Sequence, residues 1–223
     1  MNKIFSFTGA KKIVFGNGSL AGLPGYLAEQ NAKNPLLVID KNLAQAGYQE
    51  KLAAILGAAK IKYTMYDKVV PEPPIELADA GASLAVKNKC DSVIGIGGGS
   101  AMDVAKAIAV LAANKGKAVD YLGLNKVPKA GLPKIMIPTT AGTGSEVTFT
   151  AVFIRKDLKK KEGMNSPHLF PELAVLDPEL TLSLHAAPTA HTGLDALCHA
   201  IESYTSIIAS PMSEMISLEA IML

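Results

Sequence analysis

Short, continuous apolar runs alternate with longer segments of helical period between residues 36 and 140, and this alternation constrains the fold more than any other feature. The runs have the length of strands, and the segments between them have apolar residues at helical spacing. The predicted strands are 36–40, 61–67, 92–97 and 134–140, and the predicted helices are 43–59, 75–88 and 101–114. Strands that are apolar throughout are typical of a parallel sheet with helices on both faces. The sequence therefore predicts an α/β fold with a Rossmann-like parallel sheet.

The pattern changes after the last of these strands. Residues 147–157 predict one or two strands, and 173–180 predict a strand that ends in a turn. From Pro188 onward the spacing is helical, and the final residues are apolar without a polar stop. We therefore expect an α/β domain over 1–180 and, over 181–223, the beginning of an all-helical domain that continues beyond this chain.

Composition narrows the class of protein. Apolar residues make up 49% and charged residues 19%, which is typical of a soluble globular chain. The net charge of +2, with no interleaving of basic and aromatic residues, argues against a nucleic-acid partner. The longest apolar stretch is about half the length of a membrane span and contains Lys106, so we expect no membrane insertion.

The predicted location is the cytoplasm. Lys11 and Lys12 interrupt the apolar run near the start of the chain, so we predict no signal peptide. Two cysteines give no disulfide framework, which is consistent with a reducing compartment.

A glycine-rich stretch, GIGGGSAMDVAK (95–106), lies where the third strand gives way to a helix. Glycines let the backbone approach a diphosphate, and a helix N-terminus offers unpaired N–H groups. Ser100 is a candidate N-cap with Asp103 three residues on, as in a capping box. The stretch departs from the usual dinucleotide fingerprint because serine replaces the last glycine and the third strand precedes it. A tight turn that needs positive φ is the alternative.

Two further stretches fit a nucleotide site. Asp40 closes the first predicted strand, where a carboxylate can accept both hydroxyls of an adenosine ribose and repel a 2′-phosphate. An N-cap aspartate is the alternative. PTTAGTGSEVT (138–148) places hydroxyls and small residues after the fourth strand, as a polar loop over a nucleotide requires, and a Thr/Ser-rich turn is the alternative. The three stretches together favour the nucleotide interpretation.

The stretch TGLDALCHAIESY (192–204) contains a carboxylate and an imidazole four residues apart. Asp195 and His199 would lie on one face of a helix that begins at Thr192 or Gly193, where they can chelate one divalent cation. This pair suits iron(II) or zinc better than calcium. By itself, such spacing is more typical of an exposed pair or a satisfied core histidine, and a catalytic site usually needs more ligands.

Three neighbouring candidates are weaker. His191 precedes Asp195 by four residues, but the expected helix start between them disfavours a three-ligand face. Cys198 would point about 100° away from His199 around the helix, so we expect it to be buried and inert. His168 lies in a predicted loop without a partner.

Four motifs in this order resemble the iron-containing (group III) alcohol dehydrogenase family over essentially all 223 residues. They are GGGSAMDVAK, IPTTAGTGSEVT, LDPELT and TGLDALCHAIESY. The resemblance implies an α/β domain that binds NAD(P), a helical metal-binding domain of the dehydroquinate-synthase type, and a catalytic cleft between them. It implies interconversion of small primary alcohols or diols and aldehydes by hydride transfer at the nicotinamide. We also expect a homo-oligomer, because the apolar faces of the final helices would lack a cover.

The resemblance also implies site residues. It places Asp40 at the adenosine ribose, which favours NAD over NADP, and Lys161 near the nicotinamide ribose. It makes Asp195 and His199 metal ligands, with iron(II) as the metal or zinc as the alternative, and it gives His191 no role. The implied cofactor-binding residues are Asp40, Gly97, Gly98, Gly99, Ser100, Asp103, Thr139, Thr140, Thr143, Thr150 and Lys161.

The chain departs from the family pattern in three places. Glu72 stands where the family commonly has asparagine, and LHAAP (184–188) replaces a more proline-rich turn. The family's other two metal-binding histidines, and a histidine of the proton relay, would lie beyond residue 223. One alternative is therefore a catalytically incomplete nucleotide-binding fragment. Another is a polyol-phosphate dehydrogenase or dehydroquinate-synthase-like lyase, against which the second and third motifs argue.

Overall fold

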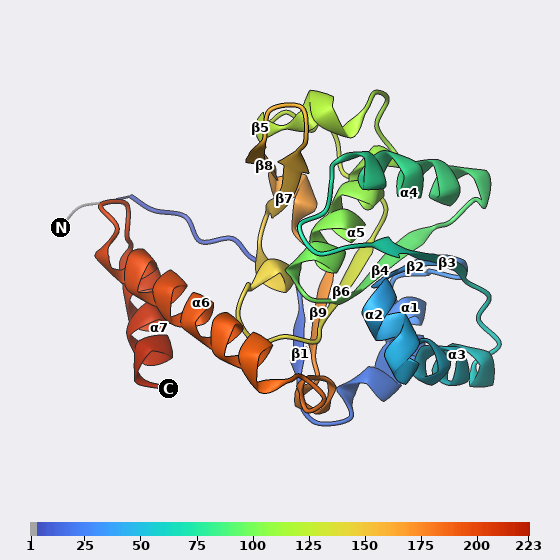
Figure 1. The fold of residues 1–223 in the computed structure, drawn as a ribbon, viewed down its shortest axis with the longest axis horizontal. Coiled ribbons are helices and arrows are strands. Elements are labelled where there is room, and N and C mark those ends of the chain that lie inside the picture. Colours follow the sequence, from blue (N-terminus) through green and yellow to red (C-terminus); the bar gives the residue numbers. More distant parts are fainter. Residues whose placement is uncertain (1–3) are drawn as a thin grey trace.

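The computed structural model describes residues 4–223. Residues 1–3, which belong to the N-terminal stretch for which no signal peptide was predicted, lie outside the described residues. The centre of the structure is a six-stranded parallel sheet in the order β1-β9-β6-β4-β2-β3 (Figure 1). The strands are β1 (Ile13–Phe15), β2 (Pro35–Asp40), β3 (Thr64–Val69), β4 (Ser92–Gly97), β6 (Lys134–Pro138) and β9 (Leu173–Leu176). The predicted α/β fold with a parallel sheet is confirmed.

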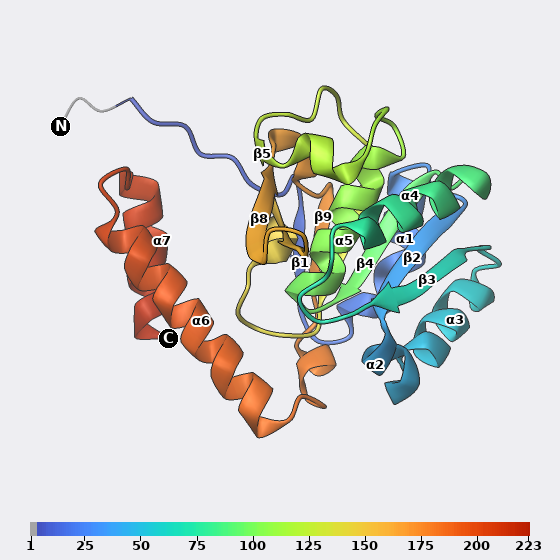
Figure 2. The same cartoon turned by 45° about the horizontal axis from the view of Figure 1, so that its top comes forward.

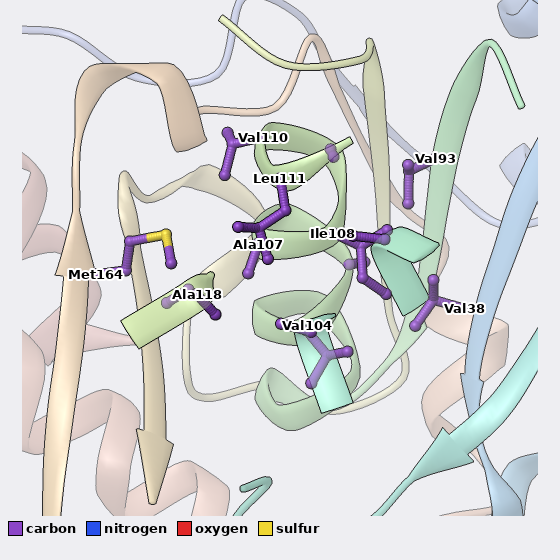
Figure 3. Close-up of a cluster of buried hydrophobic side chains, with 14 of the residues drawn as sticks. Val38, Val93, Val104, Ala107, Ile108, Val110, Leu111, Ala118 and Met164 are labelled. Atoms are coloured by element: carbon purple, nitrogen blue, oxygen red, sulfur yellow. The ribbon is translucent and has the colours of Figure 1, made fainter. Parts of the chain in front are cut away.

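Two helical layers cover the sheet. On one face lie α4 (Glu76–Lys87) and α5 (Gly99–Leu111), and on the other lie α1 (Leu23–Glu29) and α3 (Gln49–Ala58). Within β2, Leu36 and Val38 belong to the core under α5, whereas Leu37 and Ile39 belong to the core under α3, as the two-residue period of a strand requires. Figure 3 shows part of the first core, in which Ile108 of α5 and Val38 belong to the same cluster.

The direction of travel across the sheet reverses between β2 and β4. From β2 the chain passes to β3 at one edge and then returns to β4, on the opposite side of β2. Open α/β sheets bind ligands beyond the carboxyl ends of their strands at such a switch point. The fold therefore directs attention to the residues that follow β2 and β4.

A smaller sheet was predicted only in part. β7 (Thr150–Arg155) and β8 (Lys160–Asn165) form an antiparallel hairpin, and β5 (Gly123–Leu124) pairs with β8 in parallel. The predicted strand region 147–157 contains β7. The sequence of β8, KKEGMN, has too few β-branched and aromatic residues to predict a strand.

The helix predicted over 43–59 is interrupted. α2 (Lys41–Leu43) is followed by a π-helical turn over Ala44–Tyr48 and only then by α3. Gly47 has a φ of 90°, in the left-handed region that glycine adopts readily and a helix excludes. The strand predicted over 61–67 corresponds to β3, which begins three residues later, at Thr64, and ends at Val69.

Two long helices end the described chain. α6 (Ala186–Thr205) and α7 (Pro211–Met222) pack against each other and extend away from the main sheet (Figure 2). Every residue of both helices is described, and only Ala200 and Ser217 are buried. Their exposed apolar side chains include Leu194, Leu197, Ile201, Tyr204, Met215, Ile216, Leu218 and Met222. The predicted helical ending is confirmed, whereas the division into domains after residue 180 stays a prediction.

Within residues 4–223, no helix combines the length and the apolar character that crossing a membrane requires.

Candidate cofactor and metal site

The carboxyl ends of three neighbouring strands bring the three predicted nucleotide stretches together. β2 ends at Asp40, β4 ends at Gly97, and Thr139 follows β6. The Thr139 N–H donates to the Gly97 carbonyl at 3.0 Å, which fixes the start of the polar loop against the glycine stretch. The three stretches meet at the switch point, as the fold requires.

The glycine stretch makes a tight entry into α5. Gly97 has a φ of 143°, and a Cβ there would lie 2.8 Å from the Ala101 Cβ, so a side chain is excluded. The prediction that Ser100 is the N-cap is wrong, because Gly98 is the N-cap and caps without a side chain. The helix therefore starts before Ser100. A Cβ at Gly99 would lie 3.1 Å from Cγ2 of Thr143, which packs directly over this turn.

Asp40 is an N-cap, which was the alternative interpretation of this residue in the sequence. Its Oδ1 accepts hydrogen bonds from the N–H groups of Asn42 and Leu43, at 2.9 and 3.0 Å, and it is the N-cap of α2. Its Oδ2 lies against the other side of the glycine turn, 3.2 Å from where a Cβ of Gly97 would stand. Capping uses Oδ1 and leaves Oδ2 beside the glycine turn. The predicted contact of Asp40 with a ribose stays a prediction.

Asp103 joins α5 to the β7 side of the site. One carboxylate oxygen accepts from the Ser145 hydroxyl at 2.6 Å, and the other accepts from the Val152 N–H at 2.9 Å. Asp103 also forms an ion pair with Lys106 at 3.2 Å. It therefore has a scaffolding role that the capping-box interpretation missed, and its direct contact with a cofactor stays a prediction.

The polar loop after β6 presents its hydroxyl groups in several directions. Thr143 Oγ1 accepts from the Ser145 N–H at 3.3 Å. Thr140 Oγ1 is buried, and no hydrogen-bond partner lies within the described residues. Thr140 lines a side cavity of about 260 Å³ together with Glu146 and Thr181. The loop thus forms a wall for two neighbouring cavities.

One open cavity of about 540 Å³ brings together most of the predicted site residues. Those that line it are Gly99, Ser100, Asp103, Thr143, Thr150, Lys161, Asp195 and His199. Asp40, Gly97, Gly98, Thr139 and Thr140 are not among its lining residues, although they lie in or beside the adjoining turns. Residues separated by a hundred positions thus share one cavity.

The β hairpin and the 71–74 loop form part of the cavity wall. Thr150 donates its hydroxyl hydrogen to Asn165 Oδ1 at 2.8 Å, across the β7–β8 pair. Lys161 of β8 forms an ion pair with Glu72 at 2.6 Å, and both side chains line the cavity. The Glu72 contact was missed because the sequence offers no signal that joins the 71–74 loop to β8.

α6 places the candidate metal ligands at the edge of the cavity. Asp195 Oδ1 and His199 Nε2 lie 3.8 Å apart, on one face of the helix. Two atoms that each lie about 2.1 Å from a shared zinc ion can be at most about 4.2 Å apart, so the pair fits one ion. Among the described residues, no group of three or more His, Cys, Asp or Glu side chains is placed to hold a metal.

Three expectations for this helix need correction. α6 begins at Ala186, before the expected start at Thr192 or Gly193, because the helical pattern extends through Pro188 in the first turn. His191 therefore lies inside the helix, although it does not line the cavity. Cys198 is exposed, not buried, because nothing in the described chain packs over that side of α6.

Gly142 sets the approach of the polar loop to α6. A Cβ at this position would lie 2.5 Å from the Thr192 carbonyl oxygen, so the two backbones touch. This contact joins the polar loop to the part of α6 that precedes Asp195 and His199. Sequence reasoning missed it, because a glycine in a loop is equally consistent with a turn.

Burial alters the acidity of two side chains behind the wall. Burial lowers the pKa of Lys106, and the nearby carboxylates of Asp103 and Glu146 partly oppose this effect. Burial raises the pKa of Glu146, and its own backbone and Lys106 partly oppose that. The Lys106 ammonium and the Glu146 carboxylate therefore both lose solvation on folding and interact with each other.

The fold is that of a doubly wound α/β protein, and its candidate site is a cavity beside the N-terminus of α5, the helix that follows β4, with α6 at its edge. The chain belongs to the iron-containing alcohol dehydrogenase family. The family's sequence model matches residues 10–178, and the model of its Fe-containing C-terminal part matches residues 189–223. The predicted family membership is confirmed.

Individual relatives agree. The chain is 41% identical to a long-chain-alcohol dehydrogenase of Geobacillus thermodenitrificans over 211 residues. This alignment covers 93% of this chain and 53% of that protein. It resembles the structure of a 1,3-propanediol oxidoreductase with a TM-score of 0.93 and 31% identity, over 97% of this chain and 57% of that one. A sulfoacetaldehyde reductase from Bifidobacterium kashiwanohense, solved with NAD+, matches with a TM-score of 0.90 and 33% identity, over 99% and 58%. The chain spans about half the length of the curated relatives it matches.

Proposed function

We propose that this chain binds NAD in the 540 Å³ cavity and that the whole protein transfers a hydride between a primary alcohol or diol and the cofactor, yielding the aldehyde. A divalent metal held in part by Asp195 and His199 would assist, with iron(II) as the first choice and zinc as the second. The observation that carries the proposal is the convergence of the glycine stretch, the hydroxyl-bearing loop and the Asp–His pair on one cavity.

Each part of the wall has a chemical task in this proposal. The N-terminal N–H groups of α5 suit a diphosphate, because Gly97, Gly98 and Gly99 have no side chains of their own that would keep a ligand from the backbone. The hydroxyls of Thr143 and Thr150 and the ammonium of Lys161 suit the sugar and phosphate oxygens. NAD would supply the hydride acceptor, and the metal would supply the Lewis acidity that lowers the pKa of the alcohol.

Calorimetric titration with NAD tests the cofactor half. We expect heat of binding with the wild-type chain and its loss with Gly99→Val, because the added side chain would meet Thr143. Gly193→Val is the matched control, since a Cβ at that position has open space around it. A folded wild-type chain that gives no NAD signal would refute the proposal.

Asp40 should set the choice between NAD and NADP. Asp40→Asn keeps an N-cap side chain for α2 but removes the charge that would repel a 2′-phosphate. We expect the preference for NAD to shrink in this variant, without loss of helix content by circular dichroism. An unchanged ratio of the two affinities would show that Asp40 only caps α2.

A catalytically incomplete nucleotide-binding form is the second candidate. It is favoured by the absence, within residues 4–223, of a third side chain beside Asp195 and His199 that could complete a metal site. Equilibrium dialysis against zinc and, without oxygen, iron(II) separates the two. NAD binding with only weak metal binding supports this second form, whereas tight binding that is lost in His199→Ala supports a complete site.

We also propose self-association through the exposed apolar side chains of α6 and α7, because large uncovered apolar surfaces commonly mark interfaces. A cytoplasmic location is proposed from the two free cysteines. The division after residue 180 is proposed to separate the cofactor-binding part from the metal-binding part.

A further inference from the structure

Lys106 is a charged side chain in the buried, mainly apolar part of α5. It lies in α5, where the buried residues around it are alanine, valine, isoleucine, leucine and methionine. The residue has 0% of its surface exposed. A lysine ammonium placed there must have partners for its protons, because an unpaired buried charge is strongly unfavourable.

Besides Asp103, three hydrogen-bond acceptors of its ammonium lie in the segment 145–150, which runs up to the first residue of β7. Lys106 Nζ donates to the carbonyl oxygen of Ser145 at 2.9 Å, to Thr148 Oγ1 at 3.3 Å, and to the carbonyl oxygen of Thr150. One lysine therefore gathers three points of a short, irregular stretch and satisfies two carbonyl groups.

Asp103 holds the same segment from one helical turn earlier. Its carboxylate pairs with the Lys106 ammonium and also accepts from the Ser145 hydroxyl and the Val152 N–H. The two side chains are three residues apart on α5 and lie on the same face. Together they clamp residues 145–152 to the helix that begins at the glycine turn.

The clamped segment forms a cavity wall next to the N-terminal turn of α5. Ser145, Thr148, Thr150 and Val152 all line the cavity, whereas Lys106 does not. The distance between the α5 N-terminus and these hydroxyls is therefore set by a group behind the wall, which cannot itself contact a ligand in the cavity.

We propose that Lys106 is a positioning residue for cofactor binding, holding residues 145–152 at the correct distance from the glycine turn. The proposal rests on the NAD site proposed above. It predicts that removal of the ammonium group loosens one wall of the cavity while the six-stranded sheet stays intact.

A second buried lysine provides a matched control. Lys134 is 1% exposed and pairs with Glu172 at 3.4 Å, but it lies at the amino end of β6, away from the carboxyl ends that form the cavity. Lys106→Met and Lys134→Met remove the same group from equally buried positions and keep a side chain of similar length. A purely structural role would give the two variants the same pattern of effects.

The test combines NAD titration with amide hydrogen exchange of the wild type and both variants. In Lys106→Met we expect the dissociation constant for NAD to rise about tenfold or more, since hydrogen bonds to a charged group are lost. We also expect faster exchange over 145–152, with β2 and β4 still protected. In Lys134→Met, NAD affinity and exchange over 145–152 should stay near wild type, whatever its melting temperature.

Wild-type affinity and exchange in Lys106→Met would overturn the proposal, and so would an equal loss of NAD affinity in Lys134→Met. If Lys106→Met does not fold, a double variant that combines Lys106→Met with Asp103→Asn is used instead. It also removes the Asp103 carboxylate charge, which would otherwise lose its ion-pair partner. This double variant should fold and still show fast exchange over 145–152, and wild-type protection there would overturn the proposal. If the wild type fails to bind NAD, the proposed function fails, and exchange alone decides whether Lys106 holds the segment.

Discussion

α5 and α6 both have apolar residues at helical spacing, yet they end in opposite environments. Ten of the thirteen residues of α5 are buried, whereas α6 buries only Ala200 along its whole length. α5 lies between the main sheet, α4 and β7, whereas α6 packs mainly on α7. A helix can thus form from its spacing and termini alone, while its burial depends on which neighbours the chain supplies. The α5 side of the cavity is consequently fixed by a core, whereas the Asp195–His199 pair is not.

The largest expected contrast comes from equivalent truncations in the two regions. Leu56→Ala removes a fully buried side chain of α3 and should lower the free energy of unfolding by about 2–5 kcal/mol. Leu194→Ala in α6, where the side chain is 61% exposed, should change it by less than about 0.5 kcal/mol. Urea unfolding followed by circular dichroism measures both. Similar losses would mean that α6 is as firmly packed as the α/β layers.

The contact between the two regions can be broken at Gly142. Gly142→Val would force a side chain against the Thr192 carbonyl and should cost about 1–3 kcal/mol of strain or displace α6. Displacement should expose the segment before α6 to limited proteolysis, while the main sheet keeps its hydrogen-exchange protection. Gly193→Ala, which adds a methyl group in open space, should leave the proteolytic pattern unchanged.

A smaller effect should appear in the pH dependence of stability. Burial raises the pKa of Glu146, so the native state holds this proton more tightly than the unfolded chain does. Stability should therefore fall as the pH rises from about 4.5, the ordinary value, through the folded pKa, by at most about 1.4 kcal/mol per pH unit for one group. Glu146→Gln removes this loss, so its advantage over wild type should grow across that window. A constant difference between the two proteins would argue against the burial effect.

Adding a charged side chain to the exposed face of α6 should change the stability least. It should nevertheless clearly lower the mass of the associated species in solution. Ile201→Lys adds a charge to a partly exposed apolar position and should shift sedimentation toward the monomer. Leu158→Lys, in the loop of the β7–β8 hairpin, is the matched control and should leave the association state unchanged. A wild-type chain that sediments as a monomer at all concentrations would contradict the proposed self-association.

Much of this arrangement could be predicted from local sequence, and the rest depends on contacts between distant segments. The strand 92–97 and the helical ending were predicted because apolar period and glycine punctuation are local signals. Ser100 was assigned wrongly as an N-cap because the extended backbone of Gly98 lets α5 start earlier, and glycine gives no side-chain signal for this. The Lys106 contacts and the Gly142 approach could not be predicted, because each joins residues that only the folded sheet brings together.

One side of the cavity comes from a single helix, whereas the other side comes from strands that are far apart in the sequence. This difference has a consequence for how the cavity is assembled during folding. Asp195 and His199 are placed by a single helix, which forms on the microsecond scale once its turns are nucleated. The opposite wall requires β2, β4, β6 and β7 to align, and pairing between distant strands is slow because each loop must close first. We therefore expect α6 to gain amide protection before residues 145–152 in pulse-labelling experiments. The Asp195–His199 pair would then exist as a preformed feature, before the cavity that it borders is complete.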